Sequence, residues 1–141
     1  MHRAWRIRGG VCVVSLLLWG LSAEEVAAGG VEELLQAYRG QGAGPFLAAQ
    51  GERLFHERAG EGAGSEASRC ADCHGQSPGA QGRHVRTGKE IAPLSPLLQP
   101  ERLQDAAKVE KWFLRNCKGT WGRACSAQEK GDLLTYFATV R

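Results

Sequence analysis

The chain has 141 residues and a formal charge of +3 at neutral pH, a length that fits one domain, alone or with a targeting segment. Its 43% hydrophobic and 23% charged residues exclude a chain that is disordered throughout. The positive charge is scattered and no nucleic-acid-binding motif is present, so we expect no nucleic-acid partner. Aromatic residues are only 7% of the chain, which favours a bound group that helps to fill the core.

The first 28 residues have the pattern of a secretory signal peptide. Three arginines within the first eight residues precede an apolar run over residues 11–19, and small residues follow. The alternative is an uncleaved membrane anchor, but the run is shorter than the roughly 20 apolar residues that span a bilayer. We therefore expect cleavage after Ala23 or Ala28, a mature domain of residues 29–141, a periplasmic location and no stable membrane insertion.

Apolar residues at helical spacing predict four helices. The first lies over residues 31–38, and the second begins at Pro45, a residue type favoured in a first helical turn. Asp105 is a suitable cap for the third helix, whose apolar face runs over residues 109–117. Ser126 opens the fourth helix with a Ser-x-x-Glu capping box.

The intervening segments predict loops and no strands. Residues 60–68 are small and polar, and residues 75–100 contain several glycines and prolines without a sustained period. A 26-residue loop is unusual in so small a domain unless it wraps a bound group. The sequence therefore predicts an all-α domain of short helices and loops around a cofactor.

One motif points to that cofactor. Cys70-Ala71-Asp72-Cys73-His74 has the C-x-x-C-H spacing of c-type haem attachment. Thiols three positions apart can form thioether bonds with the two vinyl groups of a porphyrin, and the adjacent His74 can ligate the iron. A zinc site would need a fourth ligand, and no second ligand pair follows. A thioredoxin-type dithiol would need a βαβ context, which is absent. We predict one covalent haem c.

Three further segments follow the motif. They are residues 86–94 (RTGKEIAPL), 108–117 (KVEKWFLRNC) and 122–125 (GRAC). Together with the motif and the C-terminal amphipathic helix they resemble the sphaeroides haem protein family, a set of small exported class I-type monohaem cytochromes c. The resemblance covers roughly residues 31–140. It implies a class I-type cytochrome fold.

The resemblance also implies roles for individual residues. His74 and Asn116 are the two iron ligands, and Cys117 and Cys125 form a disulfide next to Asn116. By similarity to cytochromes c, the carbonyl of Pro93 accepts a hydrogen bond from Nδ1–H of His74 and so orients the ring. The alternative is that Pro93 only forms a turn. Small diatomic ligands bind when the iron is reduced.

Elimination also favours Asn116 as the sixth ligand. The only methionine is Met1, which leaves with the signal peptide. His56 is expected on the surface of its helix and His84 in a solvated loop, although His84 is close enough to the motif to be a rival. Asn116 is the only asparagine and precedes the C-terminal helix. Its alternative role is to cap the C-terminus of its own helix.

Cys117 and Cys125 remain once the other cysteines are accounted for. Cys12 leaves with the signal peptide, and Cys70 and Cys73 hold the haem. The remaining pair can bond in an oxidising compartment, with a contribution of roughly 2.5 kcal/mol to stability. The bridge is expected both to fix the segment that carries Asn116 and to stabilise a small secreted domain.

These observations predict a periplasmic cytochrome that transfers single electrons and binds O₂, NO or CO when its Asn116 ligand is released. The alternative is a haem enzyme or sensor for O₂, NO or peroxide. A catalyst needs distal groups that handle protons, and none is evident near Asn116, so we favour a carrier or ligand-binding protein.

The expected partners are other redox cytochromes, including multihaem or membrane-bound ones. Their candidate docking residues, which could equally form a solvated face, are Lys89, Lys108, Lys111 and Lys118.

Overall fold

The computed structural model describes residues 29–60 and 69–141. The expected signal peptide and most of the loop expected over 60–68 lie outside these residues. The elements in chain order are α1 (Gly30–Gly40), α2 (Ala48–His56), α3 (Cys70–His74), β1 (Gly82–Arg83), β2 (Glu90–Ile91), α4 (Ala106–Trp121) and α5 (Ala127–Thr139). The helical fold is confirmed. The β1–β2 ribbon was not expected, because two-residue strands leave no alternating pattern.

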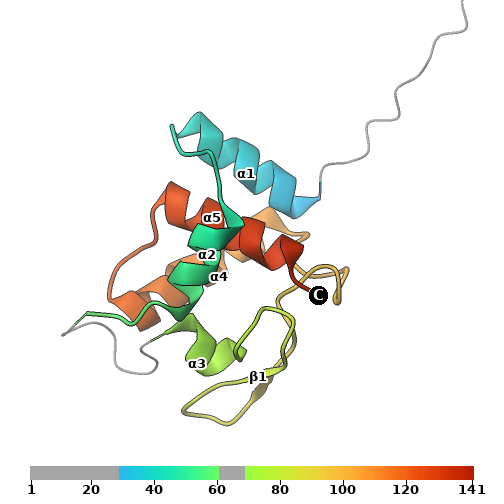
Figure 1. Cartoon of the computed structure of the whole chain (residues 1–141), viewed down its shortest axis with the longest axis vertical. Coiled ribbons are helices and arrows are strands. Elements are labelled where there is room, and N and C mark those ends of the chain that lie inside the picture. Colours follow the sequence, from blue (N-terminus) through green and yellow to red (C-terminus); the bar gives the residue numbers. More distant parts are fainter. Residues whose placement is uncertain (1–28, 61–68) are drawn as a thin grey trace, which may run out of the picture.

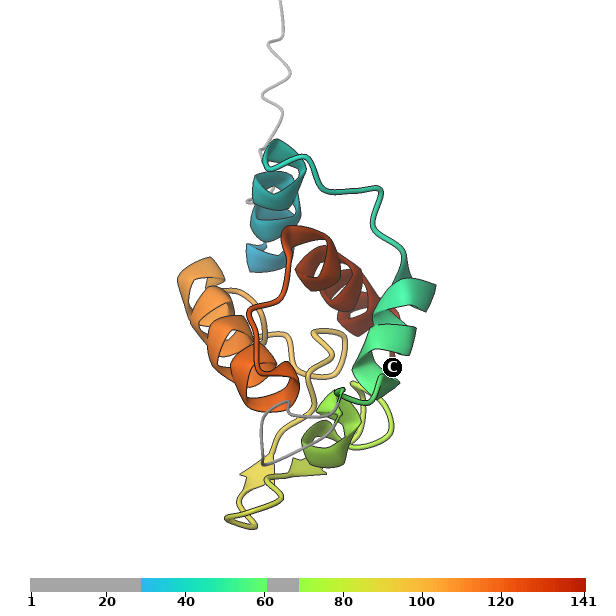
Figure 2. The ribbon, with the colours of Figure 1, turned by 90° about the vertical axis from the view of Figure 1, so that its left-hand side faces the viewer.

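The helices form a small bundle with the motif at one end. α1 lies at one end of the molecule, and α3 lies at the other beside the β1–β2 ribbon (Figures 1 and 2). Figure 2 shows α4 and α2 on opposite sides of α5. None of the helices in the described segments is long and apolar enough to cross a membrane.

α2 and α5 cross at very short range. A Cβ atom on Gly51 would lie 2.1 Å from the backbone oxygen of Asp132, so this approach requires glycine. Close by, the ring of Phe55 packs edge-on against Tyr136 and Phe137, with centroid distances of 5.8 and 5.9 Å. The crossing fixes the position of α5, whose Leu133 and Phe137 line the same cavity as the cysteines of α3.

The second helix begins later than its sequence indicates. It starts at Ala48 rather than Pro45, and the preceding chain is held extended by contacts with α5. The amide of Leu47 donates to Oδ1 of Asp132 at 2.8 Å. A Cβ atom on Gly131 would lie 2.3 Å from the ring of Phe46, so that ring rests directly on α5. Tertiary contacts therefore override the helix-starting preference of proline.

The two C-terminal helices begin where their capping residues predict. Asp105 accepts a hydrogen bond from the amide of Lys108 at 2.9 Å. Ser126 accepts from the amide of Glu129 at 3.2 Å, and the Glu129 carboxylate accepts from the amide of Ser126 at 2.8 Å. α4 continues to Trp121, so Asn116 lies inside this helix and does not cap its end.

A charged network joins α1, α4 and α5. The buried Tyr38 donates its hydroxyl hydrogen to Glu110. Lys130 donates to both carboxylate oxygens of Glu110 at 2.8 and 2.9 Å, and its ammonium lies 4.6 Å from the Tyr38 ring centroid. This network holds α4 in place on the side away from the motif.

Candidate haem-binding site

The C-x-x-C-H motif forms the five-residue helix α3. The spacing of three residues places Cys70 and Cys73 on the same face of the helix. Arg69 closes its start, since its amide donates to Asp72 at 3.0 Å and its guanidinium pairs with the same carboxylate at 2.8 Å. Behind the helix, a Cβ atom on Gly82 would lie 2.2 Å from the Cys73 backbone oxygen. Glycine at this position lets β1 pass directly behind the motif.

A cavity of about 800 Å³ opens in front of the motif. This volume lies within the usual range for small-molecule and cofactor sites. All three motif side chains expected to hold haem line the cavity, and Asn116 lines it from α4. Its apolar lining comes from α2, α4, α5 and the segment that precedes α4, and includes Phe55, Leu94, Leu103, Val109, Trp112, Phe113, Trp121, Leu133 and Phe137.

His74 is a neutral base in this cavity. Burial, and secondly the cation of Arg102, lower its pKa to about 4. Its Nδ1 atom is buried and has no hydrogen-bond partner among the described residues. A buried polar atom without a partner is rare. Nε2, the other ring nitrogen, is the atom left to ligate iron.

The expected hydrogen bond from His74 to Pro93 is wrong. The Pro93 carbonyl instead accepts from Nε of Arg102 at 3.1 Å, and the Ala92 carbonyl accepts from Nη2 at 3.1 Å. The guanidinium also lies over the ring of Trp112, 5.1 Å from its centroid. Arg102 thus takes the carbonyl that the resemblance assigns to the histidine.

Cys70 and Cys73 are free thiols. Burial is the main reason that the pKa of Cys70 is raised to about 11. The thiol is therefore protonated at neutral pH and can add, sulfur and hydrogen together, across a vinyl double bond to give a thioether.

Both rival sixth ligands reach the cavity. Asn116 is an exposed residue of α4 on the cavity wall. His84 lies in the loop after β1, as expected, and is half-buried where it also lines the cavity. Its Nδ1 accepts from the amides of Arg86 and Thr87, both at 3.3 Å, which fixes the ring on its own turn. His56 is not among the residues that line the cavity and packs instead against Phe55.

The cavity wall is strongly basic. A single described acidic residue, Glu90, lines it against five cations, which are Arg69, Arg86, Lys89, Arg102 and Arg115. This excess of positive charge suits an anionic group such as the carboxylates of a porphyrin. Arg102 was not predicted as a site residue, because nothing in its local sequence distinguishes it from a surface arginine.

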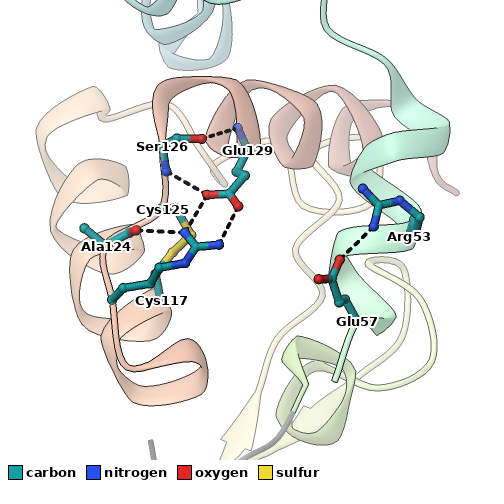
Figure 3. A network of polar contacts seen from close by, with 8 residues as sticks. Arg53, Glu57, Cys117, Ala124, Cys125, Ser126 and Glu129 are labelled. Carbon is teal, nitrogen blue, oxygen red and sulfur yellow. Dashed lines mark hydrogen bonds and ion pairs between the residues drawn. A yellow bond between two sulfur atoms is a disulfide. The ribbon is translucent and has the colours of Figure 1, made fainter. Parts of the chain in front are cut away.

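The segment after Asn116 is cross-linked. A disulfide joins Cys117 to Cys125, with 5.7 Å between the Cα atoms (Figure 3). Figure 3 also shows the reciprocal bonds of Ser126 and Glu129 at the start of α5. The end of α4 is thus tied covalently to the start of α5.

Comparison with known proteins agrees with this geometry. A family model described as a domain of unknown function (DUF1924) matches residues 41–137. The cytochrome c-type protein SHP of Cereibacter sphaeroides is 41% identical over 106 residues, which are 75% of this chain and 81% of that protein. The chain belongs to the sphaeroides haem protein family. A second relative, cytochrome c'' of Methylophilus methylotrophus, is 37% identical over 89 residues, or 63% of this chain and 61% of that protein.

Solved structures support the same assignment. A structure of oxidized SHP, described as an oxygen-binding cytochrome c, matches with a TM-score of 0.72 at 39% identity, over 78% of this chain and 96% of that one. Oxidized cytochrome c'' matches with a TM-score of 0.69 at 32% identity, over 79% and 95% of the two chains. Like these members of the sphaeroides haem protein family, the chain is a helical monohaem cytochrome c with covalent haem c.

The cavity fits this haem. Cys70 and Cys73 offer two free thiols at the attachment spacing. His74 lines the cavity and offers a neutral imidazole as an iron ligand. The basic wall offers partners for haem carboxylates. The bound group that the sequence predicts in the core is therefore a covalent haem, as in the sphaeroides haem protein family.

The disulfide gives a prediction for the purified protein. Non-reducing peptide mapping should find Cys117 linked to Cys125. Changing both residues to serine should lower the free energy of unfolding by about 2.5 kcal/mol while the haem stays attached. Two alkylatable thiols in the native wild type would contradict the pairing.

Proposed function

We propose that the chain is a periplasmic one-electron carrier whose reduced haem binds a diatomic ligand after Asn116 leaves the iron. The observation that supports this most directly is that His74 on α3 and Asn116 on α4 line the same cavity. Haem supplies a ferric–ferrous couple and a coordination position for a small ligand. His74 supplies the permanent imidazole donor on one side.

Asn116 supplies a weak donor on the other side. The oxygen of a neutral amide is a hard ligand, which suits ferric iron better than ferrous iron. Asn116 therefore holds the ferric state and releases on reduction. Asn116 is exposed on the cavity wall of α4, a position that favours movement of its side chain. The description of SHP as oxygen-binding favours the same behaviour here.

Export and electron transfer complete the proposal. The signal-peptide pattern of residues 1–28 supports a periplasmic location. Lys108, Lys111, Arg115 and Lys118 are exposed and spaced three or four residues apart, so they form a basic stripe along α4. The stripe runs beside the haem cavity, where it suits an acidic redox partner such as another cytochrome.

Spectra of both oxidation states test this function. Absorption and resonance Raman spectra should show six-coordinate ferric and five-coordinate, high-spin ferrous protein, and CO should bind the ferrous form at once. A ferrous form that is low-spin and inert to CO would contradict the proposal.

A haem enzyme or sensor is the second candidate, and the position of His84 favours it. This side chain lines the cavity and could deliver a proton to a bound ligand. Steady turnover of O₂, NO or peroxide that falls at least about a hundredfold in His84→Ala would establish the enzyme. Reversible binding without turnover would exclude that role.

A further inference from the structure

Trp121 gives bulk to the cavity wall beyond Asn116. It is the last residue of α4 and lines the cavity together with Asn116. Three smaller residues between them on the helix also line the cavity, namely Cys117, Gly119 and Thr120. Of the cavity-lining residues from Asn116 to the end of α4, Trp121 therefore has the bulkiest side chain, and its indole is half-buried.

Arg123 holds this indole from outside the cavity. Its guanidinium carbon lies 5.4 Å from the centroid of the Trp121 ring. The same guanidinium donates to both carboxylate oxygens of Glu129, at 2.7 and 2.8 Å, and to the carbonyl of Ala124 at 3.1 Å. A bidentate arginine–carboxylate pair has a defined orientation, so the plane stacked on the indole is also defined.

Arg123 and Glu129 together form a clamp on the indole, and Glu129 is itself held in place. Glu129 accepts from the amide of Ser126 at 2.8 Å and belongs to the first turn of α5 (Figure 3). The Cys117–Cys125 disulfide closes a ring of chain that contains Trp121. The indole is thus held between α4, the disulfide and the start of α5, and its position does not depend on cavity packing alone.

We propose that Trp121, positioned by Arg123, is the residue that limits the size of the ligand admitted beside Asn116. This inference rests on the proposed function, since the ligand must occupy the place that Asn116 leaves. A diatomic molecule passes the indole, whereas a branched ligand meets it. A rigid wall discriminates by size because neither the indole nor the clamp behind it can move aside without losing contacts.

Two ligands of different bulk test the proposal on the reduced holoprotein. The quantity measured is the ratio of the affinities for CO and for tert-butyl isocyanide. Removing the indole in Trp121→Ala should lower this ratio at least about tenfold, mainly through tighter isocyanide binding. Trp121→Phe, which keeps an aromatic wall and guards against a folding defect, should give an intermediate ratio.

Arginine variants test the clamp separately. Arg123→Gln should lower the ratio about threefold, the scale expected for an exposed cation–π contact. Arg39→Gln is the matched control, because it removes another exposed arginine that pairs with a glutamate, Glu32 at 3.1 Å, and lies over a ring, that of Phe46 at 5.6 Å, on α1 and outside the cavity lining. This variant should keep the wild-type ratio.

The outcomes separate the two proposals. If the wild type binds CO and the affinity ratio of both Trp121→Ala and Trp121→Phe equals that of the wild type, the size limit is overturned and the proposed function stays intact. Equal changes in Arg123→Gln and Arg39→Gln would overturn the role of Arg123 in holding the indole. A reduced wild type that is inert to CO would overturn the proposed function, and the size limit with it.

Discussion

Changing both Cys70 and Cys73 to serine is expected to leave a protein whose haem is removed completely by acidified acetone, whereas the wild type keeps one haem per chain. The two thiols are the only free cysteines among the described residues, so no other group there can form a thioether. Without these bonds, the haem depends on its iron ligands and on cavity packing, and acid removes the ligands by protonating His74. The measurement is solvent extraction followed by a pyridine haemochrome spectrum.

Single variants make this test quantitative. Cys70→Ser and Cys73→Ser should each keep the haem through one thioether, with a haemochrome band between those of the wild type and of free haem. The control changes Cys117 and Cys125 to serine, which removes the same number of sulfur atoms next to the same cavity. This control should keep its haem in acidified acetone. Haem that stays with the Cys70 and Cys73 double variant would show attachment elsewhere.

The features that the sequence predicted correctly depend on neighbouring residues. The caps at Asp105 and Ser126 act within one helical turn, so the starts of α4 and α5 follow from local chemistry. The haem motif is equally local, since its spacing alone brings two thiols and an imidazole together. The cytochrome fold was identified by resemblance in the order and spacing of short segments, because helix periodicity alone fits many small bundles.

The features that it missed depend on residues far apart in the chain. α2 starts late because Leu47 bonds to Asp132, 85 positions away. The Pro93 carbonyl is taken by Arg102, whose stacking on Trp112 could not be seen before the fold was known. His84 reaches the cavity because the chain turns back on itself between β1 and β2. In each case a tertiary contact decided between local alternatives.

Asn116→Ala is expected to change the ferric spectrum strongly and the ferrous spectrum little. In the ferric wild type the amide oxygen is the proposed sixth ligand, and alanine leaves that position to water or to no ligand. In the ferrous wild type the amide has already left, so the substitution removes nothing from the iron. Absorption and resonance Raman spectra of both states measure the difference, and CO affinity of the ferrous protein should change by no more than about threefold.

The midpoint reduction potential gives an independent measure of how strongly the Asn116 amide prefers ferric to ferrous iron. A ligand that binds only the ferric state stabilises it and lowers the potential, so Asn116→Ala should raise the midpoint. For one electron the rise is about 59 mV for each tenfold by which the amide favours ferric iron. A falling potential would mean that Asn116 stabilises the ferrous state, which contradicts release on reduction.

His84 provides the control that decides between the two candidate ligands. Both residues line the cavity, but Nδ1 of His84 is already engaged by the amides of Arg86 and Thr87, which hold the ring on its own turn. His84→Ala should therefore leave the ferric spectrum and the midpoint potential as in the wild type. An imidazole ligand would bind both oxidation states and keep the ferrous iron low-spin, because it is a stronger donor than an amide oxygen. A ferric spectrum that changes in His84→Ala and not in Asn116→Ala would assign the sixth position to His84, and reduction would then open no site for a diatomic ligand.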